Sequence, residues 1–114
     1  MDDCLFCKIV AGEIPAERIA SNDEAIAFRD INPTAPVHFL VVPRRHITNL
    51  DALTEGDRSA VAGCLELVRD AARETGVDGR GYRTLTNTGP DAGQVVLHLH
   101  FHVVGGRELG WPPG

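Results

Sequence analysis

The stretch VVLHLHFHVV, residues 95–104, decides which fold the sequence predicts, because histidine alternates with apolar residues along it. Successive side chains of a β-strand point to opposite faces, so this pattern predicts a strand with two unlike faces. One face would carry the histidines, and the other would carry Leu99, Phe101 and Val103. We expect the apolar face to pack beneath a helix and the imidazoles to face outward.

Three of the five histidines of the chain, His98, His100 and His102, lie in this alternation. They can be polar residues on a half-exposed strand, although threonine, lysine or glutamate would serve as well there. They can also bind a metal, since imidazoles two residues apart converge on Zn²⁺ at about 2.0–2.1 Å. Covalent catalysis is the third interpretation: a neutral imidazole attacks, and a protonated one assists the leaving group. Alternation alone leaves metal binding and catalysis open.

Four further segments are predicted as strands. The sequence RIASNDEAIAFRDINP predicts a hairpin of two short strands around Asn22 and Asp23, the second ending before Pro33. Residues 37–43, VHFLVVP, are almost continuously apolar, which indicates a strand buried on both faces. Residues 81–89, GYRTLTNTG, are predicted as a strand from β propensity.

Two helices are expected. Residues 4–11 allow one or two helical turns that end at Gly12. A long helix begins near Thr54, a plausible N-cap with Asp57 three residues later, and ends at Gly76. Its expected buried face consists of Val61, Cys64, Leu65, Val68, Ala71 and Ala72. The order of elements predicts an α+β domain with an antiparallel sheet, and 114 residues suit a single domain over 1–114.

The composition is that of a globular protein, with 43% hydrophobic and 24% charged residues. A net charge of −5 argues against a nucleic-acid surface, which needs clustered Lys and Arg. No run approaches the roughly 18 apolar residues of a membrane helix, and the start, MDDCLFCKIV, lacks the features of a signal peptide. We therefore expect a cytoplasmic protein without a membrane partner. Three cysteines in that compartment favour metal binding or burial over disulfides.

The loop NTGPDAGQ, residues 87–94, precedes the histidines. Its glycines allow backbone amides to approach an anion closely, and the amide side chains of Asn87 and Gln94 offer hydrogen bonds without a charge. Such a loop is also a common hairpin turn. Beside a nucleophilic imidazole, however, it predicts a seat for a phosphoryl group.

With these residues in view, the chain resembles the histidine triad (HIT) superfamily, whose signature HLHFHVV matches. FCKIVAGEIPA, AFRDINPTAPVHFLVVPRRHI, NTGPDAGQ and GGRELGWPPG resemble its nucleotide-binding HINT branch, in the same order along the chain. The resemblance implies a HIT-like fold, with a five-stranded antiparallel sheet, one long helix and one short helix. It also implies a homodimer with a ten-stranded sheet, and purine nucleoside monophosphates or their phosphoramidates as ligands.

The resemblance also implies roles for individual residues. His100 would be the nucleophile that becomes nucleotidylated, His102 would contact the phosphate and leaving group, and His98 and His38 would complete the imidazole network. Contacts around the phosphate would come from Asn87, Gly93, Gln94 and Val95, besides His100 and His102. The nucleoside pocket would consist of Phe6, Ile9, Phe28, Asp30 and Ile31, with Asp30 accepting from the ribose. Phe6, Ile9, Phe28 and Ile31 would equally suit a core.

Two features depart from many HINT relatives. Val95 stands where a serine often assists the leaving group. Cys4 and Cys7 form a Cys-x-x-Cys pair, a zinc pattern when two further ligands are present. By resemblance to relatives with this pair, we expect a structural Zn²⁺ site at Cys4, Cys7, His46 and His98 that catalysis does not require; two idle thiols are the alternative.

The resemblance thus predicts a phosphoramidase-type hydrolase that acts through a nucleotidyl-histidine intermediate without a metal at the phosphate. Three alternatives stay open: a dinucleoside polyphosphate hydrolase, a nucleotide-binding scaffold with vestigial activity, and a catalytic zinc hydrolase. The sequence does not distinguish adenine from guanine.

Overall fold

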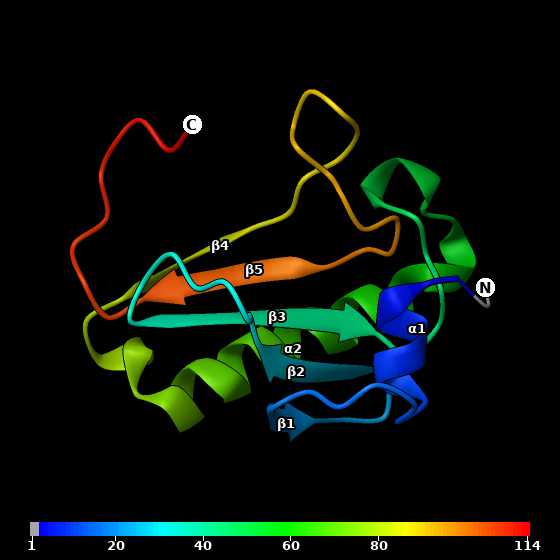
Figure 1. The fold of residues 1–114 in the computed structure, drawn as a ribbon, viewed down its shortest axis with the longest axis horizontal. Coiled ribbons are helices and arrows are strands. Elements are labelled where there is room, and N and C mark those ends of the chain that lie inside the picture. The colour runs from blue at the N-terminus through cyan, green and yellow to red at the C-terminus, as the bar shows by residue number, and fades with distance from the viewer. Residues whose placement is uncertain (1–2) are drawn as a thin grey trace.

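An antiparallel sheet of five strands forms the centre of the computed structural model, which describes residues 3–114 (Figure 1). The spatial order is β1-β2-β3-β5-β4, so β5 enters between β3 and β4. The strands are β1 (Arg18–Ser21), β2 (Ala25–Arg29), β3 (Val37–Pro43), β4 (Tyr82–Leu85) and β5 (Phe101–Gly105). This α+β arrangement confirms the predicted fold class.

The predicted hairpin is present as β1 and β2. The Asn22 side chain stabilises the turn, because its Oδ1 accepts from the backbone N–H groups of Glu24 at 3.0 Å and Ala25 at 2.8 Å. The prediction for β3 is also confirmed, since every residue after Val37 in this strand is buried. A central strand covered on both faces needs a layer on each side.

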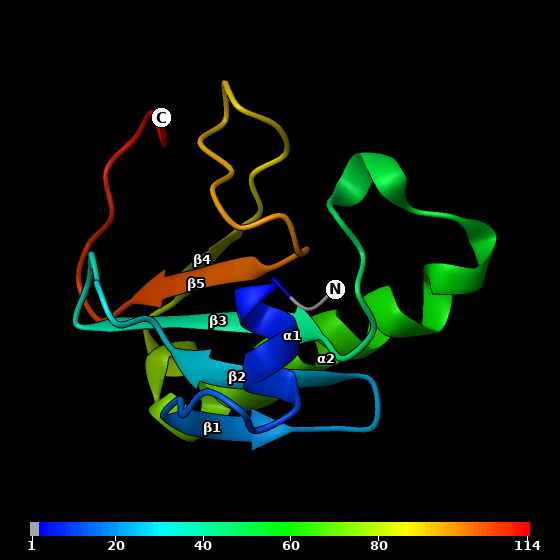
Figure 2. The same ribbon diagram turned by 45° about the vertical axis from the view of Figure 1, so that its right-hand side comes forward.

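Helices supply those two layers, as Figures 1 and 2 show: α1 (Leu5–Val10) crosses one face of the sheet, and α2 (Arg58–Thr75) covers the other. A 3₁₀ turn, Glu55–Asp57, leads into α2, and Asp57 Oδ2 accepts from the Thr54 N–H at 3.0 Å. Gly76 ends α2 with φ of 82°, a left-handed conformation that suits glycine. Two other 3₁₀ turns are Leu50–Ala52 and Val77–Gly79.

The buried face of α2 differs in part from the predicted one. Leu65 is 50% exposed and Val61 only half-buried, whereas Ala60 and Leu67 belong to the core. The cause is the close approach of the β1–β2 turn to Gly63, whose carbonyl accepts from Asn22 Nδ2 at 2.9 Å. A Cβ on Gly63 would lie 2.4 Å from Glu24 Cβ, so this helix face must turn toward the sheet and Leu65 turns away.

Two predicted strands are shorter than expected. The segment 81–89 is a strand only over β4, and 95–104 only from Phe101 onward. Residues before Phe101 leave the sheet because the Leu99 N–H donates to the Ile47 carbonyl at 2.6 Å, outside the sheet. His98 and His100 therefore precede β5, and residues 86–100 make an excursion beyond the sheet.

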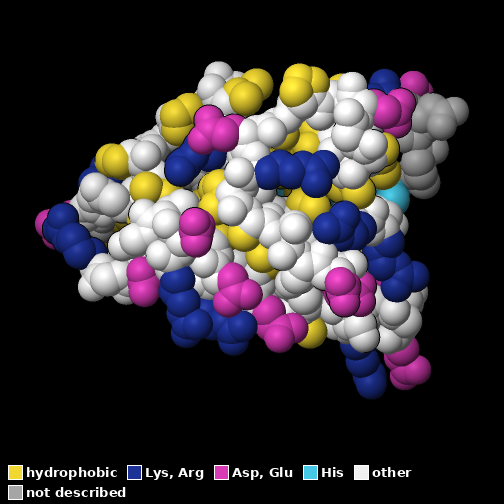
Figure 3. All heavy atoms as spheres, turned by 90° about the horizontal axis from the view of Figure 1, so that it is seen from below, with side chains coloured by type: hydrophobic (Ala, Val, Ile, Leu, Met, Phe, Trp, Pro, Cys, Tyr) yellow, Lys and Arg dark blue, Asp and Glu magenta, His cyan; other side chains and the backbone are white. Residues whose placement is uncertain are grey.

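Charged side chains of both signs lie on the surface (Figure 3). On the face seen from below in Figure 3, acidic and basic side chains are intermixed. Within residues 3–114, no helix has both the length and the apolar character needed to cross a membrane.

Candidate active site and metal site

The histidines lie on the sheet face that α1 covers, opposite the side chains that pack against α2. They share this face as predicted, but the expectation that they point outward is wrong: His98 is 0% and His100 7% exposed. Phe6 of α1 is the reason, because its ring contacts His100 edge-on at a centroid distance of 5.0 Å. The short helix thus shields the imidazoles from water.

A hydrogen bond to the backbone determines the tautomer of His100. Its Nδ1 lies 2.8 Å from the His98 carbonyl oxygen, which can only accept. Nδ1 therefore carries the proton, and in the neutral ring Nε2 holds a lone pair. Edge-on packing against Phe6 and this hydrogen bond together fix the ring orientation. His100 has the form that a nucleophile requires.

A second series of hydrogen bonds determines the tautomers of His38 and His102. The Thr34 N–H donates to His38 Nδ1 at 3.1 Å, so the proton of neutral His38 sits on Nε2. This Nε2 lies 2.9 Å from His102 Nδ1 and donates to it, which leaves the His102 proton on Nε2. The rings of His100 and His102, with centroids 5.0 Å apart, thus offer one lone pair and one N–H.

Asp30 adds a negative charge to this network. Its Oδ2 lies 3.4 Å from His38 Nε2 and 4.0 Å from His102 Nδ1, while Oδ1 accepts from the Asn32 N–H at 2.8 Å. Burial lowers the pKa of His102 to about 4, with help from the nearby His100 and His38, and Asp30 opposes that shift. His102 is therefore neutral near pH 7.

A pocket of about 560 Å³ opens beside these rings. Phe6, Ile9 and Phe28 line it although they are buried, so the two interpretations of these residues, core and pocket wall, both apply. Ile31 also lines the pocket but is 91% exposed, so the core interpretation is wrong for this residue. The predicted ligand-contacting residues that line the pocket are Phe6, Ile9, Phe28, Asp30, Ile31, Asn87, Gly93, Val95, His100 and His102.

Gln94 is the exception. Its side chain does not line this pocket; instead, Oε1 accepts from the Gly89 N–H at 2.9 Å and from Asn49 Nδ2 at 3.1 Å. Its Nε2 donates to the carbonyls of Thr48 at 2.8 Å and Val96 at 3.2 Å. The Gln94 amide thus ties the loop that precedes the histidines to the segment after β3, and it positions backbone rather than presenting a side chain to a ligand.

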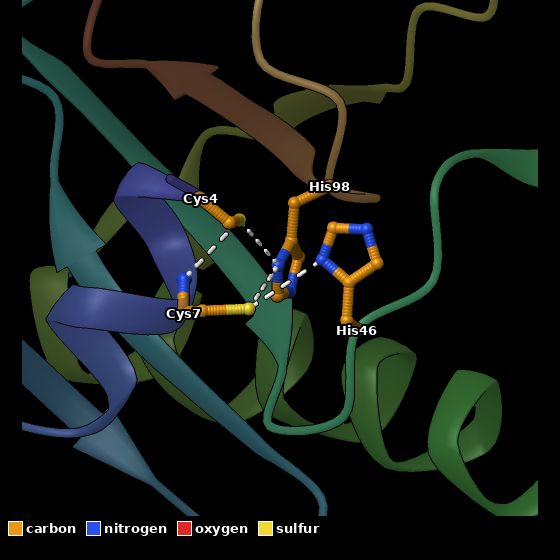
Figure 4. A group of neighbouring side chains, drawn as sticks. All are labelled: Cys4, Cys7, His46 and His98. Carbon is orange, nitrogen blue, oxygen red and sulfur yellow. Dashed lines mark hydrogen bonds between the residues drawn. The ribbon is translucent and has the colours of Figure 1, made fainter. Parts of the chain in front are cut away.

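The four predicted zinc ligands converge at the N-terminal end of α1, as Figure 4 shows. Cys4 and Cys7 come from the start of α1, His46 from the loop after β3, and His98 from the segment before β5. His98 Nδ1 lies 3.3 Å from Cys4 Sγ and 3.5 Å from Cys7 Sγ, and His46 Nδ1 lies 3.4 Å from Cys7 Sγ. All four donor atoms lie within 4.8 Å of one another.

This geometry fits zinc. With Zn–S of about 2.3 Å and Zn–N of about 2.0–2.1 Å, neighbouring sulfur and nitrogen ligands of a tetrahedral site are about 3.5 Å apart. His98 Nε2 lies 2.9 Å from the Pro43 carbonyl and donates to it, so the lone pair of His98 is on Nδ1, the atom that faces both sulfurs. Two sulfur atoms, those of Cys4 and Cys7, therefore face the single lone pair on His98 Nδ1. A metal ion can bind all three atoms at once, whereas a hydrogen bond to Nδ1 would use only one thiol. The cluster can hold a metal ion such as zinc.

Cys64, in contrast, belongs to the core under α2, as predicted. It is 0% exposed, and burial raises the pKa of its thiol to about 12. Such a thiol is chemically inert near neutral pH.

Some site residues gave no sign in the sequence. Thr34 fixes the tautomer of His38 through its backbone, and the Pro43 carbonyl does the same for His98. Backbone groups act at both places, and no side-chain pattern reveals them. Arg83 and Arg107, which line a second cavity next to His102, were not predicted as site residues either, although Arg107 lies within the stretch GGRELGWPPG.

Comparison with known proteins shows the family of this chain. The model of the HIT domain family matches residues 11–109. An uncharacterized HIT-like protein of Synechococcus elongatus is 46% identical over 113 residues, which cover 99% of this chain and 98% of the relative. The chain therefore belongs to the HIT family, a family that implies nucleotide binding.

Solved structures show the same fold. The crystal structure of a HIT family hydrolase from Legionella pneumophila superimposes with a TM-score of 0.94 at 41% identity, covering 98% of this chain and all of that one. A HIT family hydrolase from Clostridium thermocellum gives 0.93 at 38% identity, with 96% of each chain covered.

Proposed function

We propose that this protein hydrolyses purine nucleoside phosphoramidates through a covalent nucleotidyl-His100 intermediate. The observation that carries the proposal is the pairing of a lone pair on His100 Nε2 with an N–H on neighbouring His102, at the wall of a 560 Å³ pocket. The two similar HIT proteins described as hydrolases support it.

The pocket divides into parts that suit a nucleotide. Apolar side chains such as Phe6, Ile9 and Phe28 would contact the purine, and Asp30 would accept from the ribose hydroxyls. Gly93 and the backbone that follows it would lie against the phosphoryl oxygens. Backbone N–H groups of residues 93–97 would stabilise the charge that develops there during attack.

The reaction has two steps. His100 Nε2 attacks phosphorus, the Nε2–P bond forms, the P–N bond to the leaving group breaks, and the departing amine takes a proton from the imidazolium of His102, which becomes neutral. An anionic phosphoryl group next to His102 raises the pKa of that ring on binding, because negative charge favours the imidazolium. Water then attacks phosphorus, the P–Nε2 bond breaks, and the nucleoside monophosphate leaves while the proton returns to His102.

The Cys4, Cys7, His46 and His98 cluster has a different role in this proposal. A four-ligand zinc site is closed, so the ion would stabilise the fold and would not bind substrate. His98 would serve both sites: its ring ligates, and its carbonyl accepts from His100 Nδ1.

The experiment that tests the proposal is release of AMP from adenosine 5′-phosphoramidate by the wild type and by His100→Asn. Loss of the nucleophile should reduce turnover by about 10³-fold or more while AMP affinity stays within a few fold. Acid quench of the wild type should trap protein with one added nucleotidyl group. Full activity of His100→Asn would disprove the covalent mechanism.

The same assay distinguishes the alternatives. The tail GGRELGWPPG favours the HINT branch. Faster hydrolysis of dinucleoside polyphosphates than of the phosphoramidate would instead indicate a dinucleoside polyphosphate hydrolase. No AMP release together with ordinary AMP affinity would indicate a scaffold. Loss of activity on chelation without unfolding would indicate a catalytic zinc.

A further inference from the structure

A second cavity, of about 300 Å³, adjoins the catalytic histidines on the side of β4 and the C-terminal segment. It shares wall residues with the nucleotide pocket, namely Thr34, His38, Asn87 and His102. The remaining wall includes two guanidinium groups, Arg83 from β4 and Arg107 from the segment after β5. The two cavities therefore meet at His102, the residue that protonates the leaving group in the proposed reaction.

Both arginines are held in place by backbone carbonyls. Arg83 Nη2 donates to the Gly110 carbonyl at 2.9 Å, and its guanidinium lies 5.9 Å from the centre of the Trp111 ring. Arg107 Nη2 donates to the Thr34 carbonyl at 3.1 Å and Nη1 to that of Glu108 at 3.1 Å. A guanidinium has five N–H donors, so each retains donors for a ligand.

Neither arginine has a carboxylate partner among the ion pairs of residues 3–114, whereas Arg29, Arg45, Arg58 and Arg69 each have one. Two uncompensated positive charges at the wall of one small cavity favour an anion there. In the part of the chain that the structure describes, no carboxylate lines this cavity, since Asp30, whose Oδ2 lies 4.0 Å from His102 Nδ1, lines the nucleotide pocket instead.

We propose that this cavity is the leaving-group subsite and that it selects amine leaving groups that carry an anionic substituent, a carboxylate or a phosphate. This inference rests on the proposed hydrolysis of phosphoramidates. The nucleoside occupies the apolar pocket, phosphorus lies between His100 and His102, and the departing amine enters the second cavity, where Arg83 and Arg107 hold its anion. The P–N bond breaks as the Nε2–P bond forms, and the amine leaves with the His102 proton.

A matched series of substrates tests the subsite. AMP is joined through its P–N bond to a two-carbon amine that ends in a carboxylate (β-alanine), its neutral carboxamide, an ammonium (ethylenediamine) or a phosphate (phosphoethanolamine). We expect kcat/KM for the carboxylate to exceed that for the carboxamide by about tenfold or more, as for a charge-assisted bidentate contact. Comparison of kcat/KM for the phosphoethanolamine and β-alanine derivatives shows which anion the cavity prefers. Equal kcat/KM for carboxylate and carboxamide would overturn the proposal.

Variants separate charge from architecture. Arg107→Met and Arg83→Met should each lower the ratio of carboxylate to carboxamide kcat/KM several-fold, and the lysine variants should restore part of it. Arg107→Glu should shift the preference toward the ammonium substrate, which loss of packing alone would not do. Arg73→Met, on α2 across the sheet, is the matched control and should keep the wild-type ratio. An unchanged ratio in every cavity variant would contradict the subsite.

Binding measurements test the subsite independently of catalysis. If the wild type hydrolyses no member of the series, the proposed function fails, and the series is then measured as competitors of AMP binding. Tighter binding of the carboxylate than of the carboxamide, lost in Arg107→Met, would still support an anion subsite. Equal binding of the two would reject it.

Discussion

At the scale of single residues, backbone carbonyls and amides decide what each histidine can do. The His98 carbonyl sets the proton of His100 on Nδ1, and the Thr34 amide sets that of His38 on Nε2. These groups cannot titrate, so the tautomers follow from the fold and stay the same across the pH range in which the rings are neutral. The lone pair on His100 Nε2 is therefore present before substrate binds, and the proton that His102 donates is taken up on binding.

Burial of His102 makes stability depend on pH. In the folded state its pKa is lowered to about 4, whereas in the unfolded chain it is near 6.5. The unfolded state therefore binds the proton first as pH falls, and stability is lost between about pH 6.5 and 4, by up to about 3 kcal/mol. His102→Asn keeps an acceptor for His38 and removes this proton site. Urea unfolding at pH 7 and 4.5 should show a smaller acid loss for the variant; equal losses would contradict the prediction.

The sequence predicted the identities of the site residues better than their states. Alternation placed three histidines on one face, and the resemblance added His38 and His46, which the structure brings to the same two clusters. Gln94 was predicted beside the phosphate from its residue type and the resemblance, and its side-chain amide bonds to four partners: Gly89 and Val96 near it in the chain, and Thr48 and Asn49 after β3. Residue type indicates which bonds a side chain can make, and only the fold shows which of them are made.

At the scale of elements, the short α1 joins the two sites. Cys4, the N-cap of this helix, and Cys7 in its first turn supply the two thiols of the metal cluster. Phe6 packs on His100 and on Phe28 at centroid distances of 5.0 and 5.7 Å. The helix has only 6 residues, too few to be stable by its own hydrogen bonds. Its position over the histidines must therefore come from tertiary contacts and from the Cys4 and Cys7 cluster.

Strand lengths were the main error in the sequence interpretation. Alternation over 95–104 satisfies a strand pattern, yet His98 and His100 lie outside β5 because Leu99 bonds to Ile47 and Gln94 holds the preceding loop. Leu99 still packs in the core with Phe101, which preserves the alternation. A period of two records which side chains share a face, and it records neither whether that face is covered nor which backbone groups pair.

Zinc should accordingly stabilise α1 and the segment before β5. We expect stoichiometric zinc to raise Tm of metal-free protein by several degrees, as binding to the folded state alone does. Cys7→Ser should abolish the zinc-dependent increment, and native mass spectrometry should show no bound metal. Cys64→Ala, a matched cysteine variant in the core, should be less stable but keep the increment. Zinc that stabilises Cys7→Ser as much as the wild type would contradict this site.

At the scale of the whole molecule, the two edges of the sheet differ. The β1 edge has an irregular register between Arg18 and Ala20, and Glu17 beside it pairs with Arg29. Bulges and charges of this kind hinder pairing with another chain. The β4 edge pairs with β5 in regular register from Tyr82 to Leu85 and carries the exposed Thr84. A partner strand would therefore add at β4, and two copies would form a ten-stranded sheet.

The predicted homodimer can be tested at this edge. Light scattering should give about twice the 12.3 kDa of the chain for the wild type. Thr84→Lys puts a charge on the β4 edge and should shift the mass toward the monomer, because two copies of the charge would meet across a two-fold axis. Ser21→Lys, at the exposed end of β1, is the matched control and should remain dimeric. A monomeric wild type would refute the dimer, and dissociation by Ser21→Lys alone would place the interface at the opposite edge.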